Sequence, residues 1–246
     1  MTGVDLPRRL LAEFVGTALL VAVVVGSGIA AQRLSPGQVG LQLLENSITT
    51  AFGLAVLILL FGPVSGAHFN PIVSAADWLL GRRAGMGLSG REVFAYTGAQ
   101  LLGGIAGAVL ANAMFELTPV QIATTARSGA GLWLGEVVAT AGLISVIFAL
   151  ARTGRAGLSA ATVGSYIGAA YWFTSSTSFA NPAVTVGRMF SDTFAGIAPA
   201  SAPGFVAAQV VGGLLGAGLI QLLYPEIDRV ADQVVTPHPN SSQVRR

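Results

Sequence analysis

The sequence contains no cysteine and no lysine, has only two histidines, and only 10% of its 246 residues are charged. Without cysteine the chain forms no disulfide and offers no thiolate to a metal. A soluble domain carries about 25% charged residues, so too little polar surface is present to cover a water-soluble globule of this length. Soluble enzymes, disordered chains and nucleic-acid-binding proteins are therefore excluded as leading interpretations.

Apolar residues and glycine dominate instead: 53% of the residues are hydrophobic and 32 are glycine. A helix of about 20 apolar residues crosses a bilayer core, whereas half-length apolar segments are typical of re-entrant or buried elements. The sequence predicts an all-α membrane protein with six transmembrane helices and two half-helices. The spans are expected at Leu10–Ala31, Leu41–Phe61, Val93–Met114, Leu132–Ala151, Leu158–Thr174 and Gly204–Leu223, and the half-helices at Asn70–Leu80 and Asn181–Phe190.

The thirteen basic residues are all arginine and gather on one side of the predicted spans. Cytoplasmic loops of membrane proteins carry an excess of basic residues. If the N-terminus is cytoplasmic, ten arginines are cytoplasmic, Arg33 and Arg127 are external, and Arg188 falls in the second half-helix. This asymmetry predicts a multi-pass protein of the cell (inner) membrane with both termini cytoplasmic. Residues 225–246 are polar and are expected to form a solvated cytoplasmic tail.

Three sequence blocks recur in the same order in the two halves of the chain. Each half, residues 1–115 and 130–224, holds three predicted spans and one half-helix. Because three is an odd number, the second repeat enters the membrane from the opposite side, and substrate sites in such folds lie near the midplane. The paired blocks are LAEFVGT and LGEVVAT, FNPIVS and ANPAVT, and AQLLGGIAGA and AQVVGGLLGA, which begin at residues 11 and 134, 69 and 180, and 99 and 208.

Asn70-Pro71 and Asn181-Pro182 each open one of the half-helices. An asparagine oxygen accepts a backbone N–H of the first helical turn, and proline suits the first helical position. A helix N-terminus carries about half a positive charge, so two such ends meeting at the midplane would repel cations. With their oxygens used in capping, the two amides offer N–H donors to a permeating molecule. The duplicated motif therefore indicates a pore; positive half-helix ends are also known in aquaporin-type channels.

The strings SGAHFNPI at Ser65–Ile72, NPA at Asn181–Ala183 and AEFVGT at Ala12–Thr17 resemble signature motifs of the major intrinsic proteins, the aquaporin and aquaglyceroporin family. The resemblance covers about residues 8–224. It implies a right-handed bundle of six helices with two half-helices, assembled as a homotetramer with one pore per subunit. The motif residues Asn70, Pro71, Ile72, Asn181, Pro182 and Ala183 would form the centre of that pore.

The residue after the second motif is usually arginine in this family and forms one side of a narrow outer filter. Here it is Val184, and Arg188 lies one turn further along, where it cannot simply replace that arginine. Ungapped counting from the two asparagines places Thr50, Ala169 and Ser178 at the other filter positions. These small uncharged residues predict a wide, weakly polar constriction. Bacterial relatives with valine at this position are similar to channels linked to arsenic handling.

Two positions leave alternatives open. Ala51-Phe52-Gly53 resembles an aromatic-bearing stretch of water-selective relatives, which would bring Phe52 into the filter in place of Thr50. That assignment needs a shift of two residues, which turns a helix by about 200°, and Thr50 is preferred. Ile72 ends the first motif in place of alanine, and it either packs between elements or reshapes the central constriction.

Two pairs of polar residues in the spans are related by the repeat. Glu13 and Glu136 are equivalent in the repeat and are expected to accept N–H groups of the loop in their own half, with a proton relay as the alternative. Gln100 and Gln209 are expected to bind the same loops. His68 is a candidate vestibule residue that titrates near neutral pH, or a fixed anchor of its loop. No metal site is expected, because the second histidine lies in the tail.

The predicted function is a passive channel for water and small uncharged solutes, such as glycerol, urea-like molecules and neutral metalloid hydroxides such as arsenous acid, that excludes protons and ions. A water-selective channel is the alternative within the same class. A secondary transporter also fits an inverted repeat with broken helices, but no unpaired midplane acid is available for ion coupling. Partners are then the bilayer, the solute and further copies of the chain. No enzymatic activity, cofactor or nucleic acid is expected.

Overall fold

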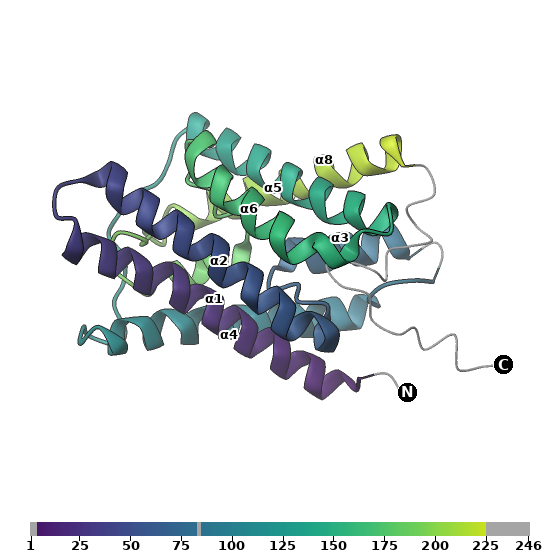
Figure 1. Cartoon of the computed structure of the whole chain (residues 1–246), viewed down its shortest axis with the longest axis horizontal. Coiled ribbons are helices and arrows are strands. Elements are labelled where there is room, and N and C mark those ends of the chain that lie inside the picture. Colours follow the sequence, from purple (N-terminus) through teal and green to yellow (C-terminus); the bar gives the residue numbers. More distant parts are fainter. Residues whose placement is uncertain (1–3, 83–84, 225–246) are drawn as a thin grey trace.

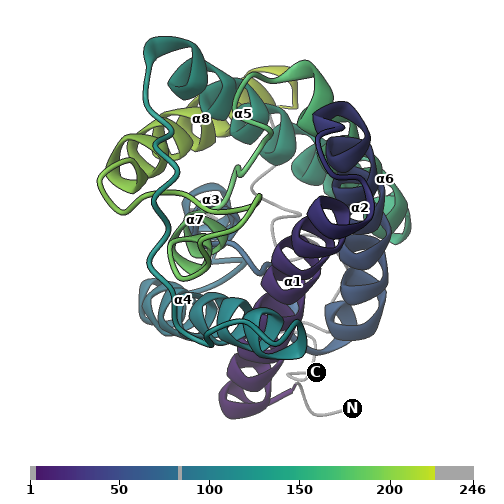
Figure 2. The same cartoon turned by 90° about the vertical axis from the view of Figure 1, so that its left-hand side faces the viewer.

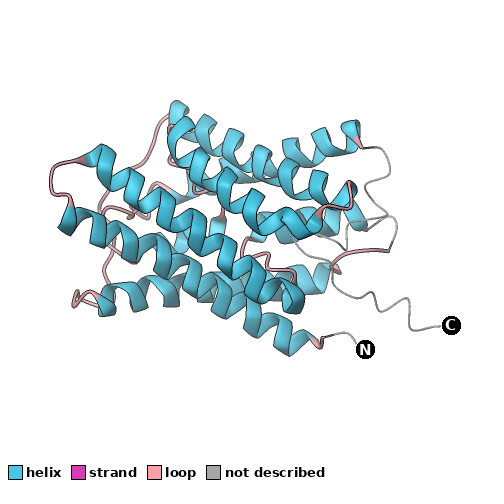
Figure 3. Cartoon of the chain, in the orientation of Figure 1, coloured by secondary structure: helices cyan, strands magenta, loops and turns pink. Residues whose placement is uncertain are grey.

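The computed structural model describes residues 4–82 and 85–224, and within these ranges the regular elements are helices, with no strand (Figure 3). This matches the all-α membrane fold expected from composition. The predicted tail, 225–246, lies outside the described residues. In chain order the elements are α1 (Leu6–Leu34), α2 (Val39–Ser65), α3 (Pro71–Gly81), α4 (Gly90–Met114), α5 (Ala130–Arg152), the short 3₁₀ turn η1 (Ala156–Leu158), α6 (Ser159–Phe173), α7 (Pro182–Arg188) and α8 (Ala202–Leu223).

Five of the described helices, α1, α2, α4, α5 and α8, are long and apolar enough to cross a membrane. The sixth predicted span, Leu158–Thr174, corresponds to α6, which has 15 residues and follows directly on η1. At 1.5 Å per residue α6 is about 22 Å long, which is short for a hydrocarbon core of about 30 Å. In Figure 1, α1 begins and α8 ends at the same end of the bundle, as an even number of crossings requires.

The helix boundaries follow local sequence signals. Ser89 accepts a hydrogen bond from the backbone N–H of Glu92, and the Glu92 carboxylate accepts one from the Ser89 N–H, so this pair forms a capping box at the start of α4. At the other end of the previous long helix, Gly66 adopts φ 88° and terminates α2. Glycine adopts this left-handed conformation without the steric cost of a Cβ atom. The chain can therefore turn sharply from α2 into the loop before α3.

The short helices α3 and α7 begin as the two Asn-Pro motifs predict. The Asn70 side chain accepts from the Ile72 N–H at 2.9 Å, and Asn181 accepts from Ala183 and Val184 at 2.9 and 3.3 Å. The N-caps are thus confirmed. Seen end-on in Figure 2, α3 and α7 lie between α4 and α8.

Helix pairing follows the sequence duplication. The helix α1 packs on α4, and its counterpart α5 packs on α8, while α2 and α6 pack on each other across the repeat boundary. Each short helix also contacts the last helix of the other repeat, α7 on α4 and α3 on α8. The two repeats are therefore interlocked through their short helices, and neither can form the centre of the bundle alone.

Glycine pairs allow this close packing. A Cβ atom at Gly103 or Gly107 would strike the backbone oxygens of Phe14 or Ala18 on α1, and the same relation holds for Gly212 and Gly216 against α5. Small residues at such Gly-x-x-x-Gly spacing let helix backbones touch inside a membrane. The interfaces α1–α4 and α5–α8 therefore depend on the absence of side chains at these positions.

We expect Gly107→Ala to lower the free energy of unfolding by about 1–3 kcal/mol, because the added methyl group overlaps the Ala18 carbonyl of α1. Gly98→Ala on the same helix is the matched control, since a Cβ atom there meets nothing within 4 Å. Thermal unfolding in detergent micelles measures both. Equal stability of the two variants would contradict close backbone contact as the basis of this interface.

Candidate functional site

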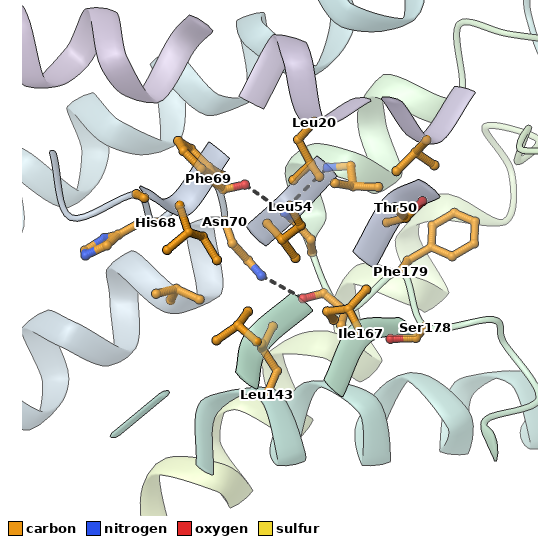
Figure 4. Close-up of a pocket in the computed structure, with 18 of the residues that line it drawn as sticks. Leu20, Thr50, Leu54, His68, Phe69, Asn70, Leu143, Ile167, Ser178 and Phe179 are labelled. Carbon is orange, nitrogen blue, oxygen red and sulfur yellow. Dashed lines mark hydrogen bonds between the residues drawn. The ribbon is translucent and has the colours of Figure 1, made fainter. Parts of the chain in front are cut away.

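An internal cavity of about 60 Å³ lies where the two repeats meet. Figure 4 shows His68 towards one end, Asn70 and Phe69 in the middle, and Thr50, Ser178 and Phe179 towards the other end. The lining comes from both repeats, so the cavity exists only in the assembled fold.

At the centre the two asparagines bind across the repeat boundary. The Asn70 amide nitrogen donates to the Ala180 carbonyl at 2.8 Å, and the Asn181 amide donates to the Phe69 carbonyl at 2.7 Å (Figure 4). Each amide has two N–H groups, so one remains on each asparagine after this exchange. Both asparagines line the cavity, and two N–H donors at the helix N-termini are therefore available there.

The lumen has one polar wall and one apolar wall. The polar wall consists of the two loops that run into Asn70 and Asn181. At the outer end Thr50, Tyr171 and Arg188 add polar groups from the helices. The opposite wall is otherwise hydrocarbon, which makes no hydrogen bond to a solute hydroxyl. Its residues come from α1, α2, α3, α5 and α6: Leu20, Val24, Leu54, Ile58, Val73, Leu143, Ile147, Val163 and Ile167.

The two loops share an unusual backbone. Ala67 and Phe69 in the first loop, and Ser178 and Ala180 in the second, have φ angles of 50°, 49°, 51° and 49°. Left-handed conformations cost of order 1–3 kcal/mol for non-glycine residues and persist only where the surroundings enforce them. The strained positions correspond in the two repeats, and all four residues line the cavity. The surrounding structure thus holds the loop backbone in a left-handed conformation where it borders the lumen.

Glu13 holds the first loop in place. Its carboxylate is fully buried and accepts from the Ser65 hydroxyl, the backbone N–H groups of His68 and Phe69, and the Gln100 amide, at 2.6–3.0 Å. Hydrogen bonds to a charged acceptor are the stronger class. All four donors belong to its own repeat, and two of them are the loop N–H groups that the sequence assigns to this carboxylate.

Glu136 performs the same task in the second repeat. It is fully buried and accepts from the backbone N–H groups of Phe179 and Ala180 at 2.8 and 2.9 Å, and from the Gln209 amide at 2.6 Å. The same Gln209 nitrogen donates to the Thr185 hydroxyl at 2.9 Å. Neither glutamate lines the cavity, so the carboxylates act on the loops and not on the lumen.

The outer end of the cavity contains Thr50, Ser178 and Val184, as ungapped counting from the motifs predicts. The Thr50 hydroxyl lies 3.2 Å from the hydroxyl of Tyr171, which also lines the cavity. Phe52, the alternative to Thr50, is 71% exposed and points away from the lumen. The choice between the two positions on α2 is therefore resolved in favour of Thr50.

The position of Ala169 requires a correction. This residue is on the exposed face of α6 and does not line the cavity, whereas Ile167 and Tyr171 of the same helix do. Ungapped counting assumed a constant loop between α6 and Asn181, and a difference of two residues turns the helix by about 200°. The filter face of α6 therefore carries an aromatic ring in place of a methyl group.

Sequence reasoning also missed two residues at the outer end, Phe179 and Arg188, both of which line the cavity. The expectation of an outer end without rings or charge is thus wrong. Arg188 lies at the C-terminal end of α7 and is only 2% exposed. The spacing of four residues between Val184 and Arg188 was the available signal, because residues i and i+4 share a helix face.

The other two candidates lie at the inner half. His68 lines the cavity, and its Nδ1 lies 3.0 Å from the Ser74 hydroxyl. Its ring packs against the Tyr96 ring with 5.5 Å between the ring centroids. Ile72 does not line the cavity; its side chain packs against Gly213 of α8. Of the two interpretations of Ile72, packing between elements is the one that this geometry fits.

We expect Glu136→Gln to lower the free energy of unfolding by about 3 kcal/mol, because an amide nitrogen would face a loop N–H in place of a charged acceptor. Thermal unfolding in micelles measures the loss, and Glu116→Gln, on the exposed surface, is the control. A Glu136→Gln protein of normal stability whose transport had lost its pH dependence would favour a proton relay instead.

A sequence profile described as Major intrinsic protein matches residues 1–178 and 174–246. Aquaglyceroporin AqpS of Rhizobium meliloti is 48% identical over 223 residues, 91% of this chain and 93% of that protein. The glycerol uptake facilitator protein of Pseudomonas aeruginosa is 32% identical over 87% of both chains.

Among solved structures, the aquaglyceroporin from Plasmodium falciparum superposes with a TM-score of 0.66 at 19% identity, covering 92% of this chain and all of that one. At this identity the match supports the fold alone. The sequence profile and the 48% identical relative go further, and they show that this chain belongs to the major intrinsic protein family.

Proposed function

We propose that the chain is a passive transmembrane channel for water and small uncharged solutes, with glycerol as the leading solute. The observation that carries this proposal is the cavity with one hydrocarbon wall and one polar wall, crossed at its centre by the two asparagine amides. A polyol has a matching division, since its carbon chain can face the apolar wall while its hydroxyl groups bind the loops. The names of the two relatives, aquaglyceroporin and glycerol uptake facilitator, support the same solute class.

Exclusion of cations follows from the ends of α3 and α7. Each helix N-terminus carries about half a positive charge, and both face the middle of the cavity. The free N–H of each asparagine donates to a solute oxygen, so a water molecule at this point accepts twice and is oriented away from its neighbours. Such an orientation interrupts a chain of proton-donating waters. The centre thus passes neutral molecules and rejects protons and metal cations.

The solutes are set by the outer end of the cavity. Val184 and Ser178 are compact, and Thr50 and Tyr171 hold their hydroxyl groups against each other. This favours compact hydroxylated molecules, a class that includes glycerol and neutral metalloid hydroxides such as arsenous acid. The water-selective alternative depended on Phe52, whose exposed position removes that support.

The membrane setting is proposed on the same basis. The exposed faces of the long helices carry large apolar side chains, among them Leu59, Leu60, Leu102 and Leu214, which suits contact with lipid or with further copies of the chain. We infer a homotetramer in the bacterial inner membrane, with both termini in the cytoplasm. The arginine asymmetry of the sequence supports this orientation.

Stopped-flow light scattering on proteoliposomes tests the function directly. We expect the wild-type chain to raise water and glycerol permeability at least tenfold over protein-free liposomes, without saturation and without dependence on a proton or sodium gradient. Urea and arsenous acid are compared in parallel to rank the solutes. Saturable uptake coupled to an ion gradient would identify a secondary transporter, and water flux without glycerol flux would identify a water-selective channel.

We expect Asn181→Asp to raise sodium permeability about tenfold, because a carboxylate places negative charge at the positive end of α7 and faces the Phe69 carbonyl without a donor. Asn46→Asp is the matched control: Asn46 is a buried amide that also donates to a backbone carbonyl, but it does not line the cavity. Sodium-sensitive dye in proteoliposomes reports the leak. A folded Asn181→Asp protein that remains tight to sodium would show that the barrier lies elsewhere.

A further inference from the structure

Arg188 is a buried cation that borders the cavity and takes no part in the asparagine barrier. Its guanidinium carbon lies 3.4 Å from the centre of the Phe179 ring, and its Nε donates to the Ala195 carbonyl. These two contacts hold the guanidinium against the wall of the cavity. A stacked arginine keeps its charge and part of its donor set. The face of the guanidinium lies on the π-system of the ring, and the N–H groups at the edge of the guanidinium stay free.

The charge of Arg188 is not neutralised locally. Within residues 4–82 and 85–224, no carboxylate lies within 4 Å of Arg188, and no protein group accepts from its two terminal nitrogens. Arginine has five N–H donors, of which four are on those terminal nitrogens. The side chain is 2% exposed and lines the cavity. Its unused donors therefore have the lumen as their available partner.

Helix geometry places this charge at the filter level. Arg188 is four residues, or about 6 Å, beyond Val184 on the same face of α7. Helical side chains point back towards the N-terminus, so the long arginine reaches towards the layer of Val184. The Phe179 ring on which it stacks is towards the same end of the cavity as Ser178 and Thr50 in Figure 4. Arg188 does not occupy the position of the family's filter arginine, as the sequence indicates, but its side chain can reach the same layer.

We propose that Arg188 supplies the cation and the hydrogen-bond donors of the outer constriction, and that it is a specificity-determining residue of this channel. Phe179 is its positioning residue. This proposal rests on the channel function proposed above. It implies that different residues set the charge and the width of the outer constriction. A guanidinium held against the wall presents donors and positive charge without projecting across the opening. Val184 leaves that opening wide.

The outer charge and the asparagine centre act in series on the same path, so the contribution of the outer charge is measured most clearly in a protein whose centre already leaks sodium. The test therefore uses Asn181→Asp as background and measures sodium permeability in proteoliposomes. We expect Asn181→Asp/Arg188→Gln to leak about ten times more sodium than Asn181→Asp, because a unit charge beside the path is lost. Asn181→Asp/Arg188→Lys keeps the charge and should stay within about twofold of the background.

Arg127 provides the matched control. It lies over the same Phe179 ring at 5.5 Å and donates to the Phe194 and Gly196 carbonyls of the same loop, but it does not line the cavity. Asn181→Asp/Arg127→Gln should therefore leave the sodium leak of the background unchanged. Equal sodium leaks from the Arg188→Gln and Arg127→Gln double variants would overturn the proposal, because any positive charge near the outer end would then limit sodium flux as well as Arg188 does.

A second measurement covers the case in which Arg188→Gln does not fold. Phe179→Leu keeps the charge but removes the stacking surface, so the guanidinium is released into the opening. We expect its glycerol-to-water permeability ratio to fall about threefold or more, because glycerol is the wider molecule, while an unchanged ratio would overturn the proposal. Absence of both water and glycerol flux in the wild type would instead refute the channel function, and this measurement is separate from the comparison of sodium leaks between variants.

Discussion

The reciprocal bond between the two asparagines and the opposite loops is the interaction on which the centre of this protein depends. Each asparagine caps its own short helix with its oxygen and donates its nitrogen to a carbonyl of the other repeat. A single amide thus fixes the helix start, the loop of the other half and one donor to the lumen. Because the exchange is mutual, displacing either helix breaks the cap geometry of both, and the two repeats are held in register.

The rest of the fold maintains that contact. Two buried carboxylates, Glu13 and Glu136, bind the N–H groups of the strained loops and thereby turn the loop backbone towards the lumen. Their burial is tolerated because each accepts at least three hydrogen bonds. Glycines at the α1–α4 and α5–α8 interfaces bring the helices close enough for Gln100 and Gln209 to reach these carboxylates. The hydrogen bonds of the buried carboxylates therefore depend on the close packing of these helices.

In the proposed channel, selectivity divides between two layers with different physics. The central layer uses helix dipoles and amide donors, which come from backbone geometry and are present whenever the short helices are capped. The outer layer is made by side chains, and there Tyr171, Phe179 and the stacked Arg188 depart from the small uncharged set expected from counting. The central layer follows from the Asn-Pro motifs that the chain shares with its family. In the proposed channel, the side chains of the outer layer set the range of solutes.

The sequence by itself determined the features that are local or duplicated. The helical composition, the N-caps at Asn70 and Asn181, and the symmetric glutamates were predictable, because capping acts within three residues and a repeated polar residue in an apolar span needs a repeated partner. Tertiary structure alone decided which face of α6 meets the lumen, so that Tyr171 lies there and Ala169 does not. It also decided where Arg188 ends. The rotation of a helix depends on packing and on loop length, and each residue of shift turns the helix by about 100°. The position of a long side chain depends on the ring against which it stacks. A sequence motif specifies neither quantity.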